Sequence, residues 1–367
     1  MRIGINLLTL TQERFGGVEQ YIKNLIAHLA DSGENLTLFL FLSTNIKNIF
    51  PYHEKIQIRM LKDPAQIHES IRQCQLDLWF CPMHSSYISD VRVPCIVTIH
   101  DVLHTAYPHF VQGGLEENNR YYHRFAPSFR KVITVSAFSR NAIANQLSIP
   151  KEKIHAIHLS APAIFDKAPA DVIRKKVKQK YQLPDTYAIY PSSFNPHKNH
   201  QNLLKAILIL REKHNTALPL ILTGYANKRN RIYQSVLRFI EEHSLENQVR
   251  VLGYVKPDEM PSLYWNSSFL VFPSLYEGFG IPLVEALKAQ RPIACSNKGS
   301  IPEVAGDAAL YFNPERPEEM ALRMKEMLNP LTRKKLWEEG KLRSQHFSWK
   351  KTAEETLHVF RSVIKKR

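Results

Sequence analysis

Short runs of apolar, often β-branched residues alternate along the whole chain with longer amphipathic stretches. Several runs are almost continuously apolar, as strands buried on both faces of a parallel sheet require. The stretches between them, such as Val18–Ala30 and Asn202–Lys213, carry apolar residues at helical spacing. This alternation predicts parallel sheets wound through right-handed crossovers. The predicted strands are Ile3–Leu8, Leu36–Leu42, Gln57–Leu61, Leu76–Cys81, Cys95–His100, Val132–Val135, Ile154–Leu159, Tyr187–Tyr190, Leu218–Thr223, Val249–Tyr254, Phe269–Phe272, Ile293–Ser296 and Ala309–Phe312.

The alternation breaks once, at an alanine- and proline-rich stretch, residues 161–171, that suits a linker. A charged helix follows, and then a fresh strand at Tyr187. A chain of 367 residues has room for two domains of ordinary size. We therefore predict an α/β protein with two doubly wound, Rossmann-like domains, residues 1–165 and 166–345, followed by a terminal helix in 346–367. Two such sheets facing each other leave a cleft at the carboxyl ends of their strands, where ligands bind.

Composition is that of an ordinary globular protein, with 44% apolar and 23% charged residues. No apolar run reaches the roughly 18 residues that a membrane helix needs. The first residues read as a buried strand and lack the pattern of a signal peptide, so we expect a cytoplasmic protein. The four cysteines form no C-x-x-C pair, and we predict buried free thiols. They are Cys74, Cys81, Cys95 and Cys295.

The net charge of +15 lies mostly in the second half, notably in Arg174–Lys180 and in residues 323–367. One interpretation is a solvated helix face and a basic terminus. The other is attraction to phosphates, either of a nucleotide or of an anionic lipid surface, which would give a weak peripheral contact at the inner face of the membrane. The aromatic spacing of an RNA-binding module is missing, so nucleic acid is not an expected partner.

The strongest chemical signal is the segment Pro273–Ala286, which leaves a predicted strand, makes a Gly-x-Gly turn and opens a helix near Pro282. Glycines let the backbone approach a ligand, and the free N–H groups at a helix start suit phosphate. Glu277 precedes the turn and is placed to meet sugar hydroxyls, whereas Glu285, one turn into the helix, is suited to a ribose diol. The predicted donor-binding turn consists of Gly278, Phe279, Gly280 and Ile281.

An ordinary strand–turn–helix corner with two surface glutamates would look similar. A dinucleotide fingerprint does not fit, because the segment has no G-x-G-x-x-G. What favours the functional interpretation is the combination: two glutamates eight residues apart bracket the glycine turn, between Pro-Ser and Ile-Pro pairs.

Pro273–Ala286 resembles the Glu-x7-Glu signature of the family 4 retaining glycosyltransferases, also called group 1 glycosyltransferases, which have the GT-B fold. Ser300–Ala309 is similar to the segment that follows in that family, and Asn195–His200 resembles its "PHKN" loop. The resemblance runs from Gly16 to the terminal helix. It implies that this helix crosses back onto the first domain, with Trp349 at the junction.

The resemblance also implies roles for residues outside the glutamate signature. Lys198 would neutralise a diphosphate leaving group, as a flexible ammonium can; a solvated loop lysine is the alternative. The family often has an arginine about six residues earlier, where this chain has Ser192. The second positive charge is therefore missing or comes from elsewhere, with His197 and Arg229 as candidates.

Gly16 and Gly17 follow the first predicted strand, where the family places a glycine pair beside the donor phosphates and the acceptor; a plain helix-entry turn is the alternative. His100 ends another strand and matches a family histidine that contacts the transferred sugar, unless it is a core histidine satisfied by Asp101. Tyr254 and Val255 resemble a loop that borders the nucleobase. Ser136-Ala137-Phe138-Ser139-Arg140 is interpreted as architecture, with Ser136 as a helix cap.

The chain has no D-x-D pair and no His/Cys cluster with metal-ligand spacing, so we expect neither a metal nor another cofactor. The predicted activity is transfer of a hexose with retention, best matched by mannose from GDP-mannose, to an oligosaccharide or lipid-linked acceptor of a cell-surface polysaccharide or lipopolysaccharide. UDP-sugars are the alternative donors. Rival functions are a sugar-nucleotide epimerase of the same fold and a non-catalytic nucleotide-sugar-binding protein.

Overall fold

The structure is a computed structural model that describes residues 1–10, 16–43, 50–61, 66–83, 88, 91–225, 227 and 229–364. By its internal contacts the chain divides into two units. Unit 1 comprises Met1–Leu159 and Ser348–Arg367, and unit 2 comprises Ser160–Phe347. Among the helices of the described part of the chain, none combines the length and the apolar character needed to cross a bilayer.

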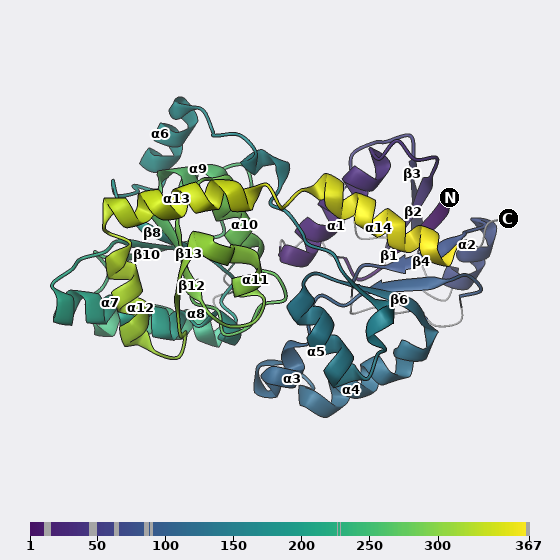
Figure 1. Ribbon diagram of the computed structural model, residues 1–367, viewed down its shortest axis with the longest axis horizontal. Helices are drawn as coiled ribbons and strands as arrows, with labels where there is room; N and C mark the ends of the chain where they lie inside the picture. Colours follow the sequence, from purple (N-terminus) through teal and green to yellow (C-terminus); the bar gives the residue numbers. More distant parts are fainter. Residues whose placement is uncertain are drawn as a thin grey trace. The chain divides into compact units, whose positions relative to one another are not determined.

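Unit 1 is built on a parallel sheet in the order β3-β2-β1-β4-β5-β6-β7 (Figure 1). The strand order reverses between β1 and β4, which makes the sheet doubly wound. Its central strands are apolar on both faces and buried, as the sequence pattern predicts. The strands are β1 (Arg2–Leu7), β2 (Thr37–Ser43), β3 (Ile56–Leu61), β4 (Leu78–Cys81), β5 (Cys95–Thr98), β6 (Phe129–Thr134) and β7 (Ile154–Ala156).

The last helix of the chain belongs to unit 1. It packs on the first helix, where the Trp349 ring lies 6.5 Å from that of Tyr21 and 6.4 Å from that of His28. Thr352 donates a hydrogen bond of 2.7 Å to the carbonyl of His158, which ties the same helix to the end of the sheet. The helices of unit 1 are α1 (Gly17–Ala30), α2 (Ile67–Gln73), α3 (Leu103–Ala106), α4 (Gly114–Phe125), α5 (Ala137–Leu147) and α14 (Trp349–Val363).

Unit 2 repeats the plan with a parallel sheet in the order β10-β9-β8-β11-β12-β13. Here the order reverses between β8 and β11. The strands are β8 (Ala188–Pro191), β9 (Leu220–Thr223), β10 (Val249–Gly253), β11 (Phe269–Phe272), β12 (Ile293–Ser296) and β13 (Ala309–Phe312).

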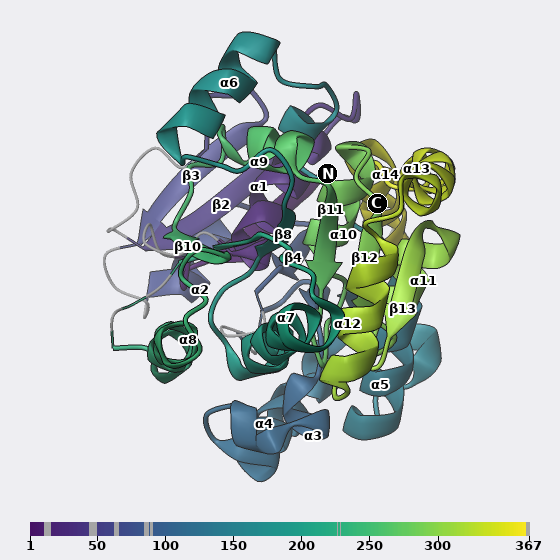
Figure 2. The same ribbon diagram turned by 90° about the vertical axis from the view of Figure 1, so that its left-hand side faces the viewer.

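Helices cover both faces of this second sheet. Figure 2 shows α7, α8 and α12 on one side of the strands and α9 and α10 on the other. The helices are α6 (Asp171–Lys180), α7 (His200–His214), α8 (Arg231–Glu242), α9 (Met260–Asn266), α10 (Ile281–Lys288), α11 (Ile301–Ala305), α12 (Pro317–Glu326) and α13 (Pro330–Ser344).

The predicted fold class is confirmed, because both units are doubly wound parallel α/β sheets and each predicted strand is present. Ser136 caps α5 by accepting a hydrogen bond of 3.0 Å from the amide of Ser139. The four cysteines are buried free thiols. The predicted boundary was placed at residue 166, and the chain passes from unit 1 to unit 2 between Leu159 and Ser160.

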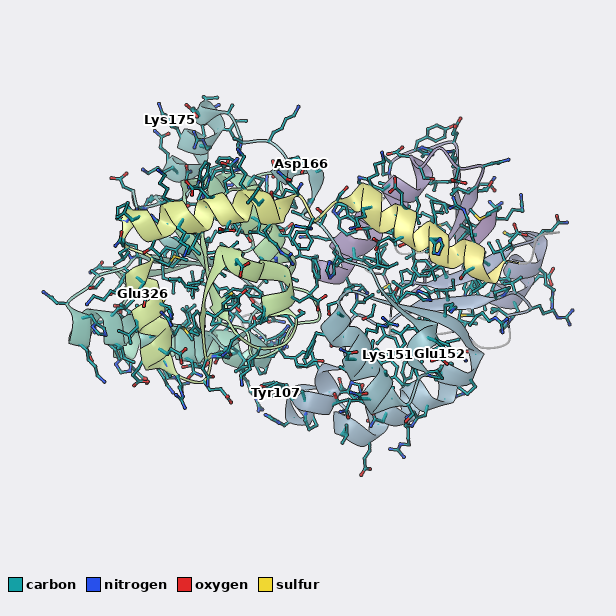
Figure 3. All side chains as sticks on the ribbon, in the orientation of Figure 1. Tyr107, Lys151, Glu152, Asp166, Lys175 and Glu326 are labelled. Carbon is teal, nitrogen blue, oxygen red and sulfur yellow. The ribbon has the colours of Figure 1, made fainter. Side chains whose placement is uncertain are left out.

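The basic run of the sequence forms the exposed face of α6, from which Lys175 projects (Figure 3). Three of its cations have acidic partners: Arg174 pairs with Asp171, Lys178 with Asp185 and Lys180 with Glu259. Much of the charge of this run is therefore balanced within unit 2. Such exposed pairs contribute little to stability, typically below about 1 kcal/mol each.

Candidate functional site

The reversal of strand order in unit 2 brings together the two strongest sequence motifs. Residues 192–199 leave the carboxyl end of β8, and residues 273–280 leave the carboxyl end of β11, its neighbour in the sheet. The amide of Leu275 donates a hydrogen bond of 2.8 Å to the carbonyl of His197, which joins the two loops. In open α/β sheets this switch point is where ligands bind, so the topology itself places both motifs at a binding edge.

Lys198 and Glu277 form an ion pair across the two loops. The Lys198 ammonium lies 2.7 Å from Oε1 and 2.9 Å from Oε2 of Glu277. Both side chains are largely shielded, with 18% and 10% of their surface exposed. The sequence predicted each residue separately, as phosphate and sugar contacts, but not their pairing. In this arrangement each charge is neutralised by the other.

The backbone that carries Lys198 is fixed by two residues that the sequence did not single out as functional. Tyr190 donates a hydrogen bond of 2.7 Å to the carbonyl of Lys198. Asn199 takes a left-handed conformation, with φ of 61°, and its amide group donates to the carbonyls of Pro273 at 3.1 Å and Pro314 at 2.7 Å. Asparagine tolerates this conformation better than most residues, and this tolerance is the sequence signal that marks it as a loop anchor.

The predicted glycine turn is buried and leads into α10, with Gly280 at the helix cap and Pro282 in the first turn. Gly280 has φ of 95°, which favours glycine, and an added Cβ would lie 3.0 Å from the Leu283 side chain. The Ser300 hydroxyl bridges the carbonyls of Glu277 at 3.0 Å and Phe279 at 3.1 Å, and so holds the turn from the start of α11. The first N–H groups of a helix have no intrahelical partner, which makes this corner suited to an anion.

Glu285 occupies a different environment from Glu277, although both belong to the same signature. It is 6% exposed, and one of its carboxyl oxygens accepts a hydrogen bond of 2.7 Å from the Tyr264 hydroxyl. Burial raises the pKa of Glu285 to about 7, and the Tyr264 hydrogen bond opposes that rise. The carboxyl is therefore about half protonated near pH 7, and its predicted contact with a ribose diol stays a prediction.

His200 lies beneath the Lys198 loop and carries no charge. It is 1% exposed and stacks on the ring of Phe194 at 4.6 Å. Burial lowers the pKa of His200 to about 3, and Lys198 and His197 add to the effect. As the first residue of α7, it packs against the loop after β8 through Phe194 and does not titrate near neutral pH.

Ser192, which directly follows β8, occupies the position where the family often has an arginine. Ser192 lies directly against Gly224, whose added Cβ would be 2.0 Å from the Ser192 carbonyl oxygen, so only glycine fits there. Arg229 is exposed on the loop after β9. The next residue, Asn230, donates a hydrogen bond of 3.0 Å to the Phe194 carbonyl, which anchors that loop beside the one that follows β8.

Tyr254 and Val255 follow β10, at the outer edge of the same sheet. Tyr254 is 46% exposed, whereas Val255 is 5% exposed. They share the carboxyl edge with Lys198 and Glu277 but lie beyond β9, two strands from β8. Only a long ligand that extends along this edge of the sheet could contact both Tyr254 and the Lys198–Glu277 pair.

The remaining predicted residues lie at the carboxyl ends of strands in unit 1. Gly16 and Gly17 begin α1, and the Gly16 amide donates a hydrogen bond of 2.8 Å to the Glu19 carboxylate. His100 follows β5, is 9% exposed, and its Nε2 lies 3.0 Å from the carbonyl of Pro82. The Tyr21 ring packs edge-on against His100 at 4.9 Å. Thus the Gly16 amide, in the glycine pair predicted to lie beside the donor phosphates and the acceptor, is bound by Glu19 in this structure.

No three His, Cys, Asp or Glu side chains gather into a set able to hold a metal ion within the residues that the structure describes.

Comparison with known proteins identifies the same two parts of the chain. Residues 15–160 match the family model described as Glycosyltransferase Family 4, and residues 172–343 match Glycosyl transferases group 1. The chain is 30% identical over 274 residues to O-antigen chain mannosyltransferase B of Escherichia coli, an alignment covering 72% of this chain and 70% of that protein. It is also 30% identical over 225 residues to O-antigen chain mannosyltransferase RfbU of Salmonella typhimurium, covering 60% of this chain and 56% of that protein.

Among solved structures, the crystal structure of Anabaena Alr3699/HepE in complex with UDP and glucose matches with a TM-score of 0.78 at 18% identity. The match covers 99% of this chain and 100% of that one. At this identity the likeness concerns the fold alone, and it confirms the GT-B fold that the sequence motifs implied.

Proposed function

The chain belongs to the family 4 glycosyltransferases, and we propose that it transfers mannose from GDP-mannose, with retention at the anomeric carbon, to a hydroxyl of a glycan acceptor. Two relatives named as O-antigen chain mannosyltransferases support mannose and a cell-surface polysaccharide or lipopolysaccharide acceptor. The proposed location is the cytoplasm or the inner face of the membrane, where a lipid-linked acceptor would be met.

The observation that carries the proposal is the Lys198–Glu277 pair at the switch point of unit 2, beside the start of α10. A nucleotide-sugar brings a diphosphate, which competes with Glu277 for the Lys198 ammonium. Glu277 is then released to accept hydrogen bonds from the sugar hydroxyls. The ammonium and the amides of the glycine turn stabilise the charge that develops on the leaving diphosphate, which is the largest contribution a preorganised site can make.

In the proposed step, the bond between the anomeric carbon and the diphosphate oxygen breaks, and a bond to the acceptor oxygen forms on the same face of the sugar. The acceptor proton passes to the departing phosphate, so no protein base is required. His100 is the proposed contact to the transferred sugar. Gly16 and Gly17 would meet the donor phosphates or the acceptor, which requires Glu19 to release the Gly16 amide.

The donor can be identified by the nucleotide-sugar that stabilises the protein. We expect GDP-mannose to raise the melting temperature more than UDP-glucose or ADP-glucose in a thermal-shift screen, because binding to the folded state stabilises it. Proton NMR of the product should then show an α-linked mannoside. A larger stabilisation by UDP-glucose would show that the proposed donor is wrong. A β-linked product would contradict retention. Conversion of the donor without acceptor would indicate the epimerase instead.

Transfer is expected to need no metal, because the Lys198 ammonium and backbone amides supply the positive charge for the diphosphate. Activity measured in excess EDTA should equal activity without chelator. Loss of activity that added Mg²⁺ restores would contradict a metal-free step.

A further inference from the structure

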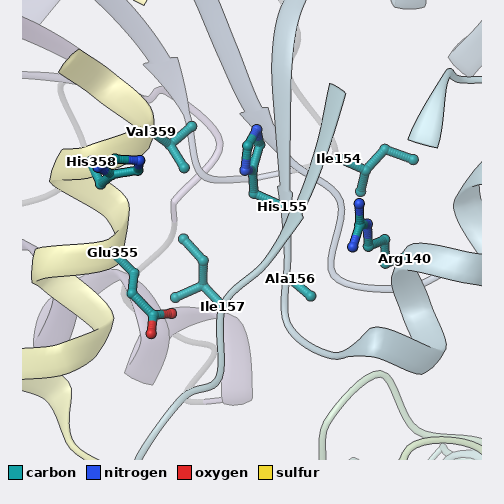
Figure 4. A pocket seen from close by; sticks show the side chains of 8 residues that line it. All are labelled: Arg140, Ile154, His155, Ala156, Ile157, Glu355, His358 and Val359. Atoms are coloured by element: carbon teal, nitrogen blue, oxygen red, sulfur yellow. The ribbon is translucent and has the colours of Figure 1, made fainter. Parts of the chain in front are cut away.

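Unit 1 contains a hollow that is distinct from the positions of Gly16, Gly17 and His100. It lies at β7, the edge strand of the sheet, between α5 and α14, and has a volume of about 290 Å³ (Figure 4). The residues predicted to bind the donor or acceptor in this unit follow β1 and β5, which lie further inside the sheet. The hollow therefore needs an explanation of its own.

Nitrogen-bearing side chains line this hollow from three elements. Figure 4 shows His155 on the side of β7 that faces α14, close to His358, and Arg140 on the side that faces α5. Arg140 uses one terminal N–H to donate to the carbonyl of Lys151 at 3.2 Å. Its Nε and the Nε2 of His155 are shielded from solvent and have no hydrogen-bond partner among the described residues. Buried polar groups are rarely left in that state.

Arg140 and Lys131 place two positive charges near His155. Burial lowers the pKa of His155, and the nearby Lys131, Arg140 and His358 lower it further. Glu355 is the acidic residue among those that line the hollow, and it also faces Lys351 at 3.9 Å. An anion in the hollow would therefore meet the Arg140 guanidinium and the nitrogens of two histidines, with Lys131 close by.

We propose that this hollow binds the phosphate group of a small phosphorylated molecule, held by Arg140 and His155 across the edge of β7 with His358 at its mouth. The guanidinium fork matches phosphate geometry, and several phosphate oxygens can accept from donors on both sides of the strand. Ile157 and Val359 offer apolar contacts to the carbon part of the ligand. The volume equals that of about ten water molecules at ~30 Å³ each, enough for a phosphate with a short carbon chain.

The ligand can come from solution or be the headgroup of a lipid, and one titration separates these sources. The His155 ring signal of the full chain is followed by NMR, and is assigned by its loss in His155→Gln. Glycerol 3-phosphate, glycerol, and vesicles containing phosphatidic acid are added in turn. We expect a saturable shift with glycerol 3-phosphate, a rise in the pKa of His155 on binding, and no response to glycerol. A response to vesicles alone would assign the site to a lipid headgroup.

Variants decide whether the response arises in the hollow. Arg140→Met should weaken binding about tenfold or more, as expected for loss of a charge-assisted contact. Lys350→Ala, which removes one charge from the exposed face of α14, should leave binding unchanged within twofold. If Arg140→Met fails to fold, the variant His358→Gln, at an exposed position, takes its place, and we expect weaker binding.

A further control separates this hollow from the donor site. Lys198→Ala should bind glycerol 3-phosphate as the parent does. Absence of any phosphate response, or a response that Arg140→Met and His358→Gln both leave intact, would overturn the proposal.

Discussion

Replacement of Lys198 by alanine is expected to lower kcat for sugar transfer by about a hundredfold, the scale observed when one charged or hydrogen-bonding contact to a transition state is lost. The ammonium stands at the switch point of unit 2 within 2.9 Å of both Glu277 oxygens, so it is held where a diphosphate would arrive. Steady-state kinetics with varied donor would measure the effect. Lys205→Ala removes an exposed charge from α7 and should leave kcat unchanged.

This prediction has to be separated from loss of folding, because Lys198→Ala leaves the shielded Glu277 carboxylate without its cation. Breaking one side of a shielded pair destabilises the protein more than removing both charges. The double variant Lys198→Ala with Glu277→Gln should therefore recover melting temperature but not activity. A folded Lys198→Ala protein with parental kcat and KM would remove this residue from the site.

The strands were predictable because their runs are apolar on both faces, a pattern with few other interpretations. The run Phe269–Phe272 and the strand β11 have identical bounds, whereas β6 begins at Phe129, three residues before the predicted start at Val132. The two consecutive charged residues Arg130 and Lys131 hide the beginning of that strand from a hydropathy pattern. The ends of a strand are set by its hydrogen bonds to neighbouring strands, here β5 and β7. The local sequence of β6 holds no information about these partners.

The motifs that carry the proposed site residues could be identified from the sequence, but the contacts between these motifs could not. Lys198 and Glu277 were identified from separate motifs, 79 positions apart in the chain. Their ion pair depends on β8 and β11 being neighbours, which follows from the order in which the strands enter the sheet. Arg140 was interpreted as architecture because its segment caps a helix. The hollow beside it is closed by α14, which follows more than two hundred residues later in the chain.

Glu285 shows most clearly what the sequence leaves open. Five residues of the eight-residue helix α10, besides Glu285, are buried: Ile281, Leu283, Val284, Ala286 and Leu287. A helix that is apolar on nearly every side gives no indication of which face meets solvent. The predicted contact of Glu285 with a ribose diol stays a prediction. What the sequence did not indicate is that this carboxyl is nearly completely buried and accepts a hydrogen bond from Tyr264.

That burial predicts a gain in stability when the charge is removed. The pKa of Glu285 rises from its ordinary value of 4.5 to about 7 in the folded protein, mainly through desolvation. Between these pH values the folded state holds a proton that the unfolded chain has released, so stability falls as pH rises through the window. The loss is about 1.36 kcal/mol per pH unit, roughly 3 kcal/mol in all, and is complete above pH 7.

Glu285→Gln cannot ionise and should escape this loss, while its side-chain oxygen still accepts from Tyr264. We expect the variant to unfold at higher denaturant concentration than the parent at pH 8, and at nearly the same concentration at pH 4.5. Exposed Glu246→Gln is the matched control and should show no such pH dependence. A Glu285→Gln protein that is less stable than the parent at pH 8 would show that the ionised carboxylate has a compensating partner. That result would also favour Glu285 as the charged acceptor for a ribose diol, because a carboxylate stable in its buried position is available in that form at neutral pH.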